Sequence, residues 1–261
     1  MRLTTFASGS SGNCALLSMD GVHLLLDAGI SCRRIRQQLR LSGLEPESLS
    51  GVLITHSHRD HICGLAVLLR ACPLPVLASQ GVARELRKKS VAGVEPCLRE
   101  LPLDTTTEFS GLRLRCFPTP HDTAYSVGWR VEGSECFALA TDMGTVTEPV
   151  RRGLLGADAA LIEANHDVEL LRYGPYPVSL KRRILSDRGH LSNAACAALA
   201  RELEESGTRY LILGHLSQEN NRPELALRTV RSALGDAAGV FVAPAQERLT
   251  LETEEALPCC W

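Results

Sequence analysis

The sequence predicts an α/β protein in which helices cover β-sheets within one compact unit. Short apolar runs of β type alternate with helical patterns in both halves of the chain. No linker, low-complexity run or short-period repeat separates the halves. The chain has 261 residues, of which 44% are hydrophobic, and this is enough to bury a sizeable core. We therefore expect a single domain over residues 1–261.

The chain begins with three short predicted strands that are separated by glycine-bearing turns. An amphipathic helix is expected at 31–41, because Ile35 and Leu39 lie about one helical turn apart among arginines. Up to residue 141, the expected strands are 2–6, 14–19, 22–27, 52–55, 76–78, 112–117, 126–131 and 137–141, and a second helix is expected at 61–71.

In the rest of the chain, predicted strands at 159–163 and 210–213 alternate with predicted helices at 192–206 and 222–234. Two last apolar runs, 241–243 and 248–251, lie close together in the sequence. We expect them to pair with each other and close the fold.

The overall composition excludes a disordered chain and gives no argument for a nucleic-acid or membrane partner. The 28 Lys+Arg side chains against 30 Asp+Glu give a formal charge of -2, and charged residues make up 22% of the chain. No uncharged apolar stretch reaches the roughly 18 residues of a membrane span. The first residues contain no apolar segment typical of a secretory signal. We therefore expect a cytoplasmic protein with no membrane partner, whose ten cysteines are reduced.

The strongest functional signal is the run His56-Ser57-His58-Arg59-Asp60-His61, between a predicted strand and a predicted helix. Neutral imidazoles and carboxylates are ligands for zinc, manganese and iron. In an extended chain His56 and His58 point to the same side, and a turn can aim Asp60 and His61 at a second metal. The alternative is a histidine-rich surface loop, but the spacing favours a metal site.

Four further polar residues each stand alone at the end of a predicted strand: Asp27, His121, Asp142 and His215. Taken singly, each is explained by a helix or turn cap, or by a buried histidine with hydrogen-bond partners. Strand ends on one side of a sheet are where open α/β folds collect their sites. Four such residues, together with the histidine run, therefore favour one shared site.

In this order, the residues resemble the signature of the metallo-β-lactamase superfamily: an aspartate, HxHxDH, a histidine, an aspartate and a final histidine. The resemblance implies a four-layer αββα sandwich with a site for two divalent metal ions. It implies that His56, His58 and His121 hold one metal and that Asp60, His61 and His215 hold the other. It also implies that Asp142 bridges the metals and that Asp27 orients a ligand histidine through a hydrogen bond.

Two cations a few ångströms apart lower the pKa of a shared water toward neutrality and thereby generate a metal-bridging hydroxide. An aspartate, Asp142, at the bridging position points toward the phosphodiesterase, nuclease and thioester-hydrolase branches of the superfamily. The metal itself stays open between zinc, manganese and iron, since all the candidate ligand atoms are nitrogen or oxygen.

Three segments are similar to motifs of the tRNase Z group: 161–164 to its HEAT segment, 189–195 to its HST segment and 213–217 to its THFS segment. By this resemblance, Glu163 orients and charges His190, which could protonate the leaving oxygen or hold a phosphate oxygen. The alternative for His190 is a helix N-terminal residue that precedes the cap Ser192. The resemblance thus makes Asp60, Glu163 and His190 the candidate catalytic residues.

The segments SGSSGNC, EANHD, RGHLSN and HLSQENN together are similar to the bacterial YycJ (WalJ) family. That group is regarded as metal-dependent, DNA-directed 5′→3′ exonucleases. The glycine-flanked Ser11 and Asn13 could present polar groups to a phosphate, although a hairpin turn explains the same residues. His166, within EANHD, receives no role, and neither does the pair Cys259 and Cys260.

Positive charge is concentrated in two segments of this nearly neutral chain. Residues 28–42 contain four arginines and no acid, and residues 169–190 contain five basic residues and two acids. Such clusters can supply salt-dependent phosphate contacts, although solvated helix faces show the same pattern. The candidate substrate-binding residues are Ser11, Asn13, Arg182, Arg183, Arg188 and Asn193.

We expect a cytoplasmic, dinuclear metal-dependent phosphodiesterase that hydrolyses nucleic acid, with DNA ends as its substrate. One alternative is a small-molecule phosphodiesterase or thioester hydrolase of the same fold. Another is a non-catalytic, metal-dependent module that binds nucleic acid. The sequence pattern gives no indication of the oligomeric state.

Overall fold

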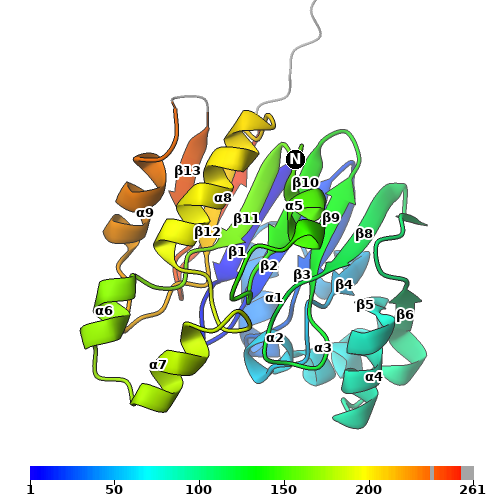
Figure 1. The fold of residues 1–261 in the computed structure, drawn as a ribbon. Coiled ribbons are helices and arrows are strands. Elements are labelled where there is room, and N and C mark those ends of the chain that lie inside the picture. Colours follow the sequence, from blue (N-terminus) through cyan, green and yellow to red (C-terminus); the bar gives the residue numbers. More distant parts are fainter. Residues whose placement is uncertain (236–237, 254–261) are drawn as a thin grey trace, which may run out of the picture.

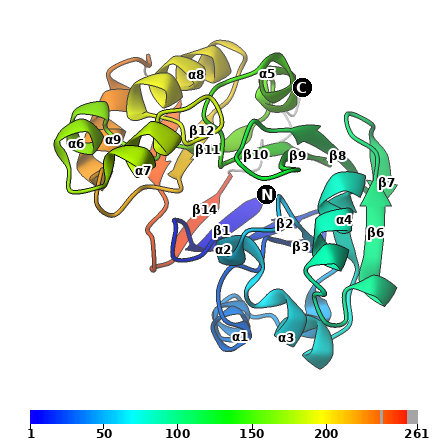
Figure 2. The ribbon, with the colours of Figure 1, turned by 60° about the horizontal axis from the view of Figure 1, so that its bottom comes forward.

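Two seven-stranded mixed sheets face each other, and helices cover their outer faces (Figure 1 and Figure 2). The computed structural model describes residues 1–235 and 238–253. The predicted α/β class and the four-layer αββα arrangement are confirmed. The pair Cys259 and Cys260, to which the sequence assigned no role, lies outside the described residues.

The first sheet has the order β14-β1-β2-β3-β4-β5-β6. Its strands are β1 (Arg2–Ala7), β2 (Cys14–Met19), β3 (Val22–Leu26), β4 (Gly51–Leu53), β5 (Val76–Ser79), β6 (Leu98–Leu101) and β14 (Leu249–Glu252). The strands from β14 to β3 are antiparallel, and those from β3 to β6 are parallel. The parallel strands β4 and β5 are buried on both faces, which is why they are continuous apolar runs.

The second sheet has the order β13-β12-β11-β10-β9-β8-β7. Its strands are β7 (Thr107–Phe109), β8 (Leu112–Pro118), β9 (Val127–Glu132), β10 (Cys136–Ala140), β11 (Ala159–Glu163), β12 (Tyr210–Gly214) and β13 (Gly239–Val242). Strands β10 to β13 are parallel, so their carboxyl ends meet at one edge. The buried Trp129 on β9 donates its indole N–H to the carbonyl of Ile54, which joins the two sheets.

The helices are α1 (Cys32–Leu41), α2 (Arg59–Ile62), α3 (Leu65–Ala71), α4 (Gln80–Lys88), α5 (Glu148–Leu154), α6 (Val168–Tyr173), α7 (Val178–Ile184), α8 (Asn193–Glu205) and α9 (Pro223–Arg231). Helices α1 to α4 lie on the outer side of the first sheet, and α5, α8 and α9 on that of the second (Figure 2). Ser31 caps α1 and Ser192 caps α8 through side-chain oxygens that accept backbone N–H groups. In the described part of the chain, no helix is long and apolar enough to cross a membrane.

The predicted pairing of the last two apolar runs is wrong. Strand β13 pairs with β12 at the edge of the second sheet, whereas β14 pairs with β1 at the edge of the first. The two runs are close in sequence, as in a hairpin, but each completes a different sheet, because two sheet edges offered unpaired backbone groups. The helix predicted at 61–71 is also divided into α2 and α3. At the break, Gly64 packs so tightly that an added Cβ would lie 2.1 Å from the Ile30 carbonyl oxygen.

Candidate metal centre

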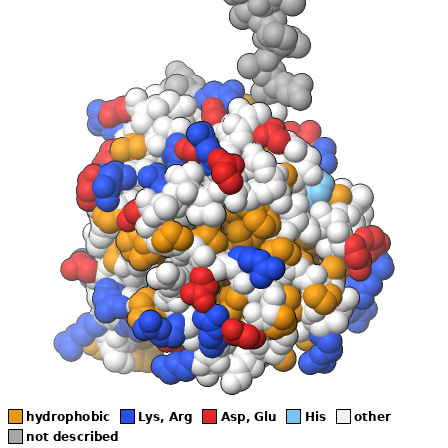
Figure 3. Space-filling model, turned by 90° about the vertical axis from the view of Figure 1, so that its right-hand side faces the viewer, with side chains coloured by type: hydrophobic (Ala, Val, Ile, Leu, Met, Phe, Trp, Pro, Cys, Tyr) orange, Lys and Arg blue, Asp and Glu red, His pale blue; other side chains and the backbone are white. Residues whose placement is uncertain are grey.

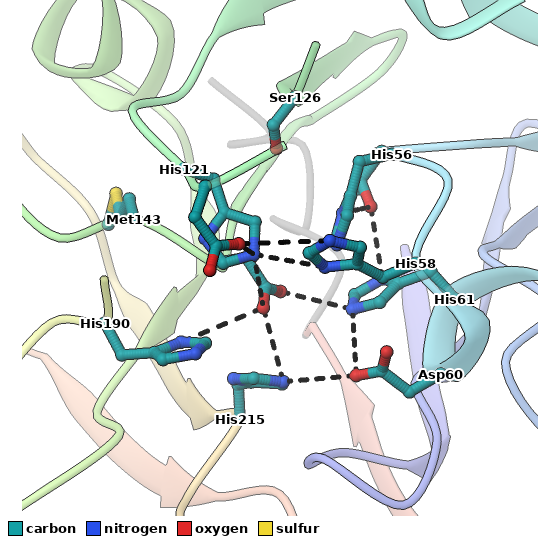
Figure 4. A network of polar contacts seen from close by, with 12 residues as sticks. His56, His58, Asp60, His61, His121, Ser126, Met143, His190 and His215 are labelled. Atoms are coloured by element: carbon teal, nitrogen blue, oxygen red, sulfur yellow. Dashed lines mark hydrogen bonds and ion pairs between the residues drawn. The ribbon is translucent and has the colours of Figure 1, made fainter. Parts of the chain in front are cut away.

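The predicted site residues gather at one end of the sandwich, where strands of both sheets end (Figure 4). His56, His58, Asp60 and His61 lie between β4 and the end of α2, and His58 is the residue that precedes this helix. The others follow strands or end one: Asp27 follows β3, His121 follows β8, Asp142 follows β10, Glu163 ends β11 and His215 follows β12. The structure thus brings residues that are far apart in the sequence into one cluster.

Three of these residues have left-handed backbone conformations that are uncommon for residues other than glycine. The φ angles are 57° for Asp27, 56° for Asp142 and 54° for His215. Each residue stands one or two positions after a strand, where a left-handed residue turns the chain sharply. Backbone strain of this kind is often found at functional sites, where the surrounding structure maintains it.

The candidate ligand atoms form two triads. His56, His58 and His121 bring one side-chain nitrogen each within 4.8 Å of one another, and Asp60, His61 and His215 do the same with their ligand atoms. Asp142 lies between the triads. Its Oδ2 is 3.2 Å from Nε2 of His61, and its Oδ1 is 3.7 Å from Nε2 of His121. This arrangement is compatible with two cations that share Asp142.

The donor set fits divalent cations. Among the described residues, Nε2 of His56, Oδ2 of Asp142 and Nε2 of His215 are buried and have no hydrogen-bond partner. Buried polar atoms normally have a partner, so three such atoms in one cluster indicate a bound group. Imidazole nitrogens and carboxylate oxygens are ligands for zinc, manganese and iron.

The protonation states also favour cation binding. Burial, together with neighbouring histidines, lowers the pKa of His56, His58 and His121, so the first triad offers neutral imidazoles. Burial opposes ionisation of Asp142, but His215 and His61 outweigh it and hold the pKa of this carboxyl well below its usual range. Burial likewise opposes protonation of His61, but Asp27 and Asp142 raise its pKa to about 10. The carboxylates around His61 and His215 therefore carry negative charge that a cation can balance in place of the protons.

Hydrogen bonds around the cluster orient its histidines. Oδ2 of Asp27 lies 2.7 Å from Nδ1 of His61, which leaves Nε2 of His61 directed at the cluster. Thr55, which the sequence analysis did not identify, donates its backbone N–H and its hydroxyl to the two oxygens of Asp27. Asn165, also missed, donates its amide to the carbonyl of His215 at 2.8 Å. Thr55 precedes the histidine run and Asn165 lies within the segment EANHD. Neither threonine nor asparagine is a typical ligand for these metals, so residue type alone did not indicate a role for them.

Glu163 is a buried carboxylate that contacts two histidines of the cluster. Its Oε1 lies 2.7 Å from Nδ1 of His190 and 3.1 Å from Nδ1 of His215, and its Oε2 accepts the backbone N–H of Met143. Burial opposes ionisation, but the two histidines lower the pKa of Glu163 to about 2. Burial also opposes protonation of His190, but Glu163 raises the pKa of its imidazole. His190 keeps 19% of its side chain exposed and can therefore meet a substrate.

The predicted substrate-binding residues lie in different environments. Asn13 lies at the cluster, with Nδ2 at 3.0 Å from Nε2 of His61, whereas Ser11 is exposed in the preceding turn. Arg188 donates to the carbonyls of His121 and Thr123 at the edge of the cluster. Arg182 is exposed on α7.

Arg183 and Asn193 have protein partners of their own. Arg183 pairs with Asp122, a residue that the sequence analysis missed and whose Oδ1 lies 3.3 Å from Nε2 of His121. Asn193 is 2% exposed, and its amide pairs with the amide of Asn221. The prediction that Asn193 contacts substrate is therefore not carried further, because burial leaves it no surface for a ligand.

Comparisons with known proteins agree with the fold. Residues 23–216 match the family model described as the beta-lactamase superfamily domain. The chain is 35% identical over 243 residues to the exodeoxyribonuclease YycJ of Bacillus anthracis and 37% identical over 239 residues to the exodeoxyribonuclease WalJ of Streptococcus pneumoniae. Both alignments cover 90% of this chain and 89% of the relative.

A solved structure with the same fold is that of Zn²⁺-bound PqqB from Methylobacterium extorquens. It superposes with a TM-score of 0.72 and 21% identity, and the match covers 97% of this chain and 100% of that one. The similarity extends over both sheets, so the chain has the fold along nearly its whole length.

Proposed function

The chain belongs to the β-lactamase superfamily and, within it, to the group of the exodeoxyribonucleases YycJ and WalJ, and from this membership we propose a DNA exonuclease that works with two divalent cations in the 5′→3′ direction. As a member of this group it is a metal-dependent hydrolase of phosphodiester bonds. The DNA substrate, the 5′→3′ direction of digestion and the number of bound metal ions are proposals.

The contact between Glu163 and His190 is the observation that most directly supports phosphodiesterase activity. A histidine that is partly exposed, and whose imidazolium a buried carboxylate stabilises, is a suitable general acid. The ring of His190 lies 5.2 Å from that of His215 and 5.3 Å from that of His121, measured between centroids. His190 can therefore donate a proton to the leaving oxygen of a phosphodiester that lies over the cluster.

The proposed ligands are His56, His58 and His121 for one cation and Asp60, His61 and His215 for the other, with Asp142 shared. When bound, such cations supply a hydroxide nucleophile and positive charge for the substrate oxygens. Asp27 and Glu163 hold the rings of His61 and His215, and they keep Nε2 of each ring directed at the cluster. Zinc, manganese and iron all suit this set of nitrogen and oxygen atoms.

Arginines near the cluster support a nucleic-acid substrate. Arg188 is held at the edge of the site by two carbonyl oxygens, and Arg183 pairs with Asp122 next to His121. A phosphate could take the place of the Asp122 carboxylate at Arg183, since arginine binds phosphate and carboxylate in the same way. Arg182, exposed on the same helix, extends the positive surface. These residues are the proposed contacts to the DNA backbone.

The experiment combines metal analysis with an end-label assay. Purified protein is loaded with Zn²⁺, Mn²⁺ or Fe²⁺, and bound metal is measured by elemental analysis. The loaded protein is then incubated with single- and double-stranded DNA that carries a label at the 5′ or the 3′ end. We expect about two metal ions per chain and early release of the 5′ label as mononucleotide, as the two-metal sites of nucleases imply.

The control variant is His23→Gln, because His23 lies on β3 outside the cluster and its ring, among the described residues, bonds to Ser18 alone. This variant should keep metal and activity, whereas His58→Ala with Asp60→Ala should lose both. Full activity of the double variant would contradict the mechanism. Hydrolysis of a small phosphodiester or a thioester with no DNA degradation would instead support a small-molecule hydrolase. A mobility shift of DNA without any product would support a binding module.

A further inference from the structure

A hollow of about 450 Å³ adjoins the candidate metal centre on the side of α4. His121 belongs both to its wall and to the first triad, so the hollow opens directly beside the cluster. Its wall is formed by the start of α4 with the preceding Ser79, by Leu103 and by the segments 118–121 and 123–127, together with Arg188. Ser126 belongs to this wall too, and Figure 4 shows it near His121 and His56. Figure 3 shows the face on which β6 and α4 lie, where hydrophobic side chains form a band between charged ones.

The most prominent group in the wall is the ring of Tyr125, which is 38% exposed. The ring lies against Gly81, where an added Cβ would stand 2.2 Å from Cδ1 of Tyr125. Glycine at position 81 therefore allows the ring to lie flat on the first turn of α4. The guanidinium of Arg84 lies 5.9 Å from the ring centroid and donates to the phenol oxygen at 3.3 Å. Tyr125 thus packs against the start of α4 and still keeps part of its side chain exposed.

The charge and the size of the hollow restrict its ligand. Two arginines, Arg84 and Arg188, belong to its wall, and no carboxylate does. Leu103, Pro118 and Pro120 supply apolar surface beside the tyrosine ring. Pockets for small organic ligands have volumes of about 300–1,000 Å³ and combine apolar walls with a few polar groups. The hollow therefore suits a flat, partly apolar group that is attached to an anion.

From this geometry we infer that the hollow binds the nucleobase of the 5′-terminal nucleotide, whose 3′ phosphodiester lies at the metal centre, with the base stacked on Tyr125. The inference rests on the proposed function, because it takes the phosphate at the cluster to be part of a DNA end. Base stacking on an aromatic ring tolerates every base, which suits an exonuclease that proceeds through any sequence. Only a deoxyribose separates a base from its phosphate, so a base pocket has to adjoin the cluster, as this hollow does through His121.

The test compares DNA whose terminal nucleotide has a base with DNA whose terminal residue is an abasic tetrahydrofuran. For the unmodified protein, loss of the base should lower kcat/KM by about 10-fold, a factor within the range for stacking of one base. Tyr125→Ala should lower kcat/KM on the normal end by the same factor and leave the abasic end unchanged. Tyr125→Phe should retain the preference for the normal end, because the ring remains.

The matched control is Tyr210→Ala. Tyr210 also has an arginine over its ring, Arg209 at 5.5 Å, but it lies at the start of β12, at the far end of this strand from His215. This variant should keep the preference for a normal end, and its thermal midpoint reports any general loss of stability. Equal loss of kcat/KM on both ends in Tyr125→Ala, or no loss on either end, would overturn the inference.

A binding measurement separates this inference from the proposed function. Deoxyadenosine 3′-monophosphate and 2-deoxyribose 3-phosphate are titrated calorimetrically into metal-loaded protein and into Tyr125→Ala. Tighter binding of the nucleotide that depends on Tyr125 supports the base pocket, even if the protein degrades no DNA. Degradation of DNA with equal binding of the two ligands would reject the pocket and retain the nuclease. If the protein neither degrades DNA nor binds the nucleotide more tightly than the sugar phosphate, both proposals are rejected.

Discussion

Oε1 of Glu163 lies 2.7 Å from Nδ1 of His190, and this contact joins the last residue of β11 to a residue three positions before the start of α8. The same oxygen lies 3.1 Å from Nδ1 of His215. One buried carboxylate thus orients both a candidate metal ligand and the candidate general acid. The contact with Glu163 thus orients the ring of His190 beside the rings of His121 and His215.

The first prediction concerns His190. His190→Gln should lower kcat by about 10²- to 10⁴-fold, the usual contribution of general acid–base catalysis. Bound metal should stay unchanged, because the six residues of the two triads and Asp142 are untouched. Elemental analysis together with the end-label assay checks both parts, with His23→Gln as the control. Loss of metal together with loss of activity would show that His190 acts as a ligand and not as an acid.

The second prediction concerns Asp142. Asp142→Asn should reduce bound metal, since the two oxygens of Asp142 face residues of both triads. The matched control is Asp104→Asn, because Asp104 is exposed and has a similar left-handed backbone, with φ of 54° against 56° for Asp142. Elemental analysis of both variants separates the effect of the carboxylate on bound metal from the effect of the left-handed backbone conformation. Unchanged metal content in Asp142→Asn would contradict the shared position.

The third prediction concerns Gly29, which packs against the backbone of Asp60 in α2. An added Cβ would lie 1.7 Å from the Asp60 carbonyl oxygen and 2.7 Å from the Asn13 backbone nitrogen. These two atoms are hydrogen-bonded at 2.7 Å, so the methyl group of Gly29→Ala has to separate them. We expect a loss of about 3 kcal/mol in the free energy of unfolding, at the upper end of overpacking effects.

Urea denaturation checks this value. Gly235→Ala is the control, since an added Cβ there meets its nearest atom at 3.6 Å, an ordinary contact. A Gly29→Ala variant as stable as the control would mean that α2 can shift away from Gly29 without a loss of stability.

The fourth prediction concerns His166, which is buried, and burial lowers its pKa to about 4 from 6.5. Because the folded-state pKa lies below the unfolded value, protonation favours the unfolded state. The stabilisation is therefore complete above pH 6.5 and is lost as the pH falls toward 4. Between pH 7 and pH 5 the free energy of unfolding should fall by about 2 kcal/mol through this residue.

Urea denaturation of the unmodified protein and of His166→Leu at both pH values tests the fourth prediction. The free energy of unfolding of the unmodified protein, minus that of His166→Leu, should be lower at pH 5 than at pH 7. The reason is that unfolding at pH 5 lets the histidine gain a proton, whereas leucine has none to gain. A difference that does not depend on pH would mean that His166 keeps an ordinary pKa in the folded state.

Much of the fold followed from local patterns. The strands from β1 to β5 and from β8 to β12 are apolar runs bounded by turn residues, and α1 and α8 have serine caps, so local chemistry identifies them. The short elements β6, β7 and α4 to α7 were missed, because each mixes polar and apolar residues over nine residues or fewer, a length too short to establish a clear period. Strands β13 and β14 were found but paired wrongly, because local sequence does not report which sheet edge is open.

For the site, the sequence by itself determined which residue types could bind metal and the order in which they occur, from Asp27 to His215. Only the tertiary structure decided that Asp142 lies between two triads, that Asp122 pairs with Arg183, and that Asn193 is buried against Asn221. It alone brought Tyr125 and Gly81 together beside His121. The physical reason is that ligand chemistry belongs to single side chains, whereas distance and burial depend on how two sheets pack across many residues of chain.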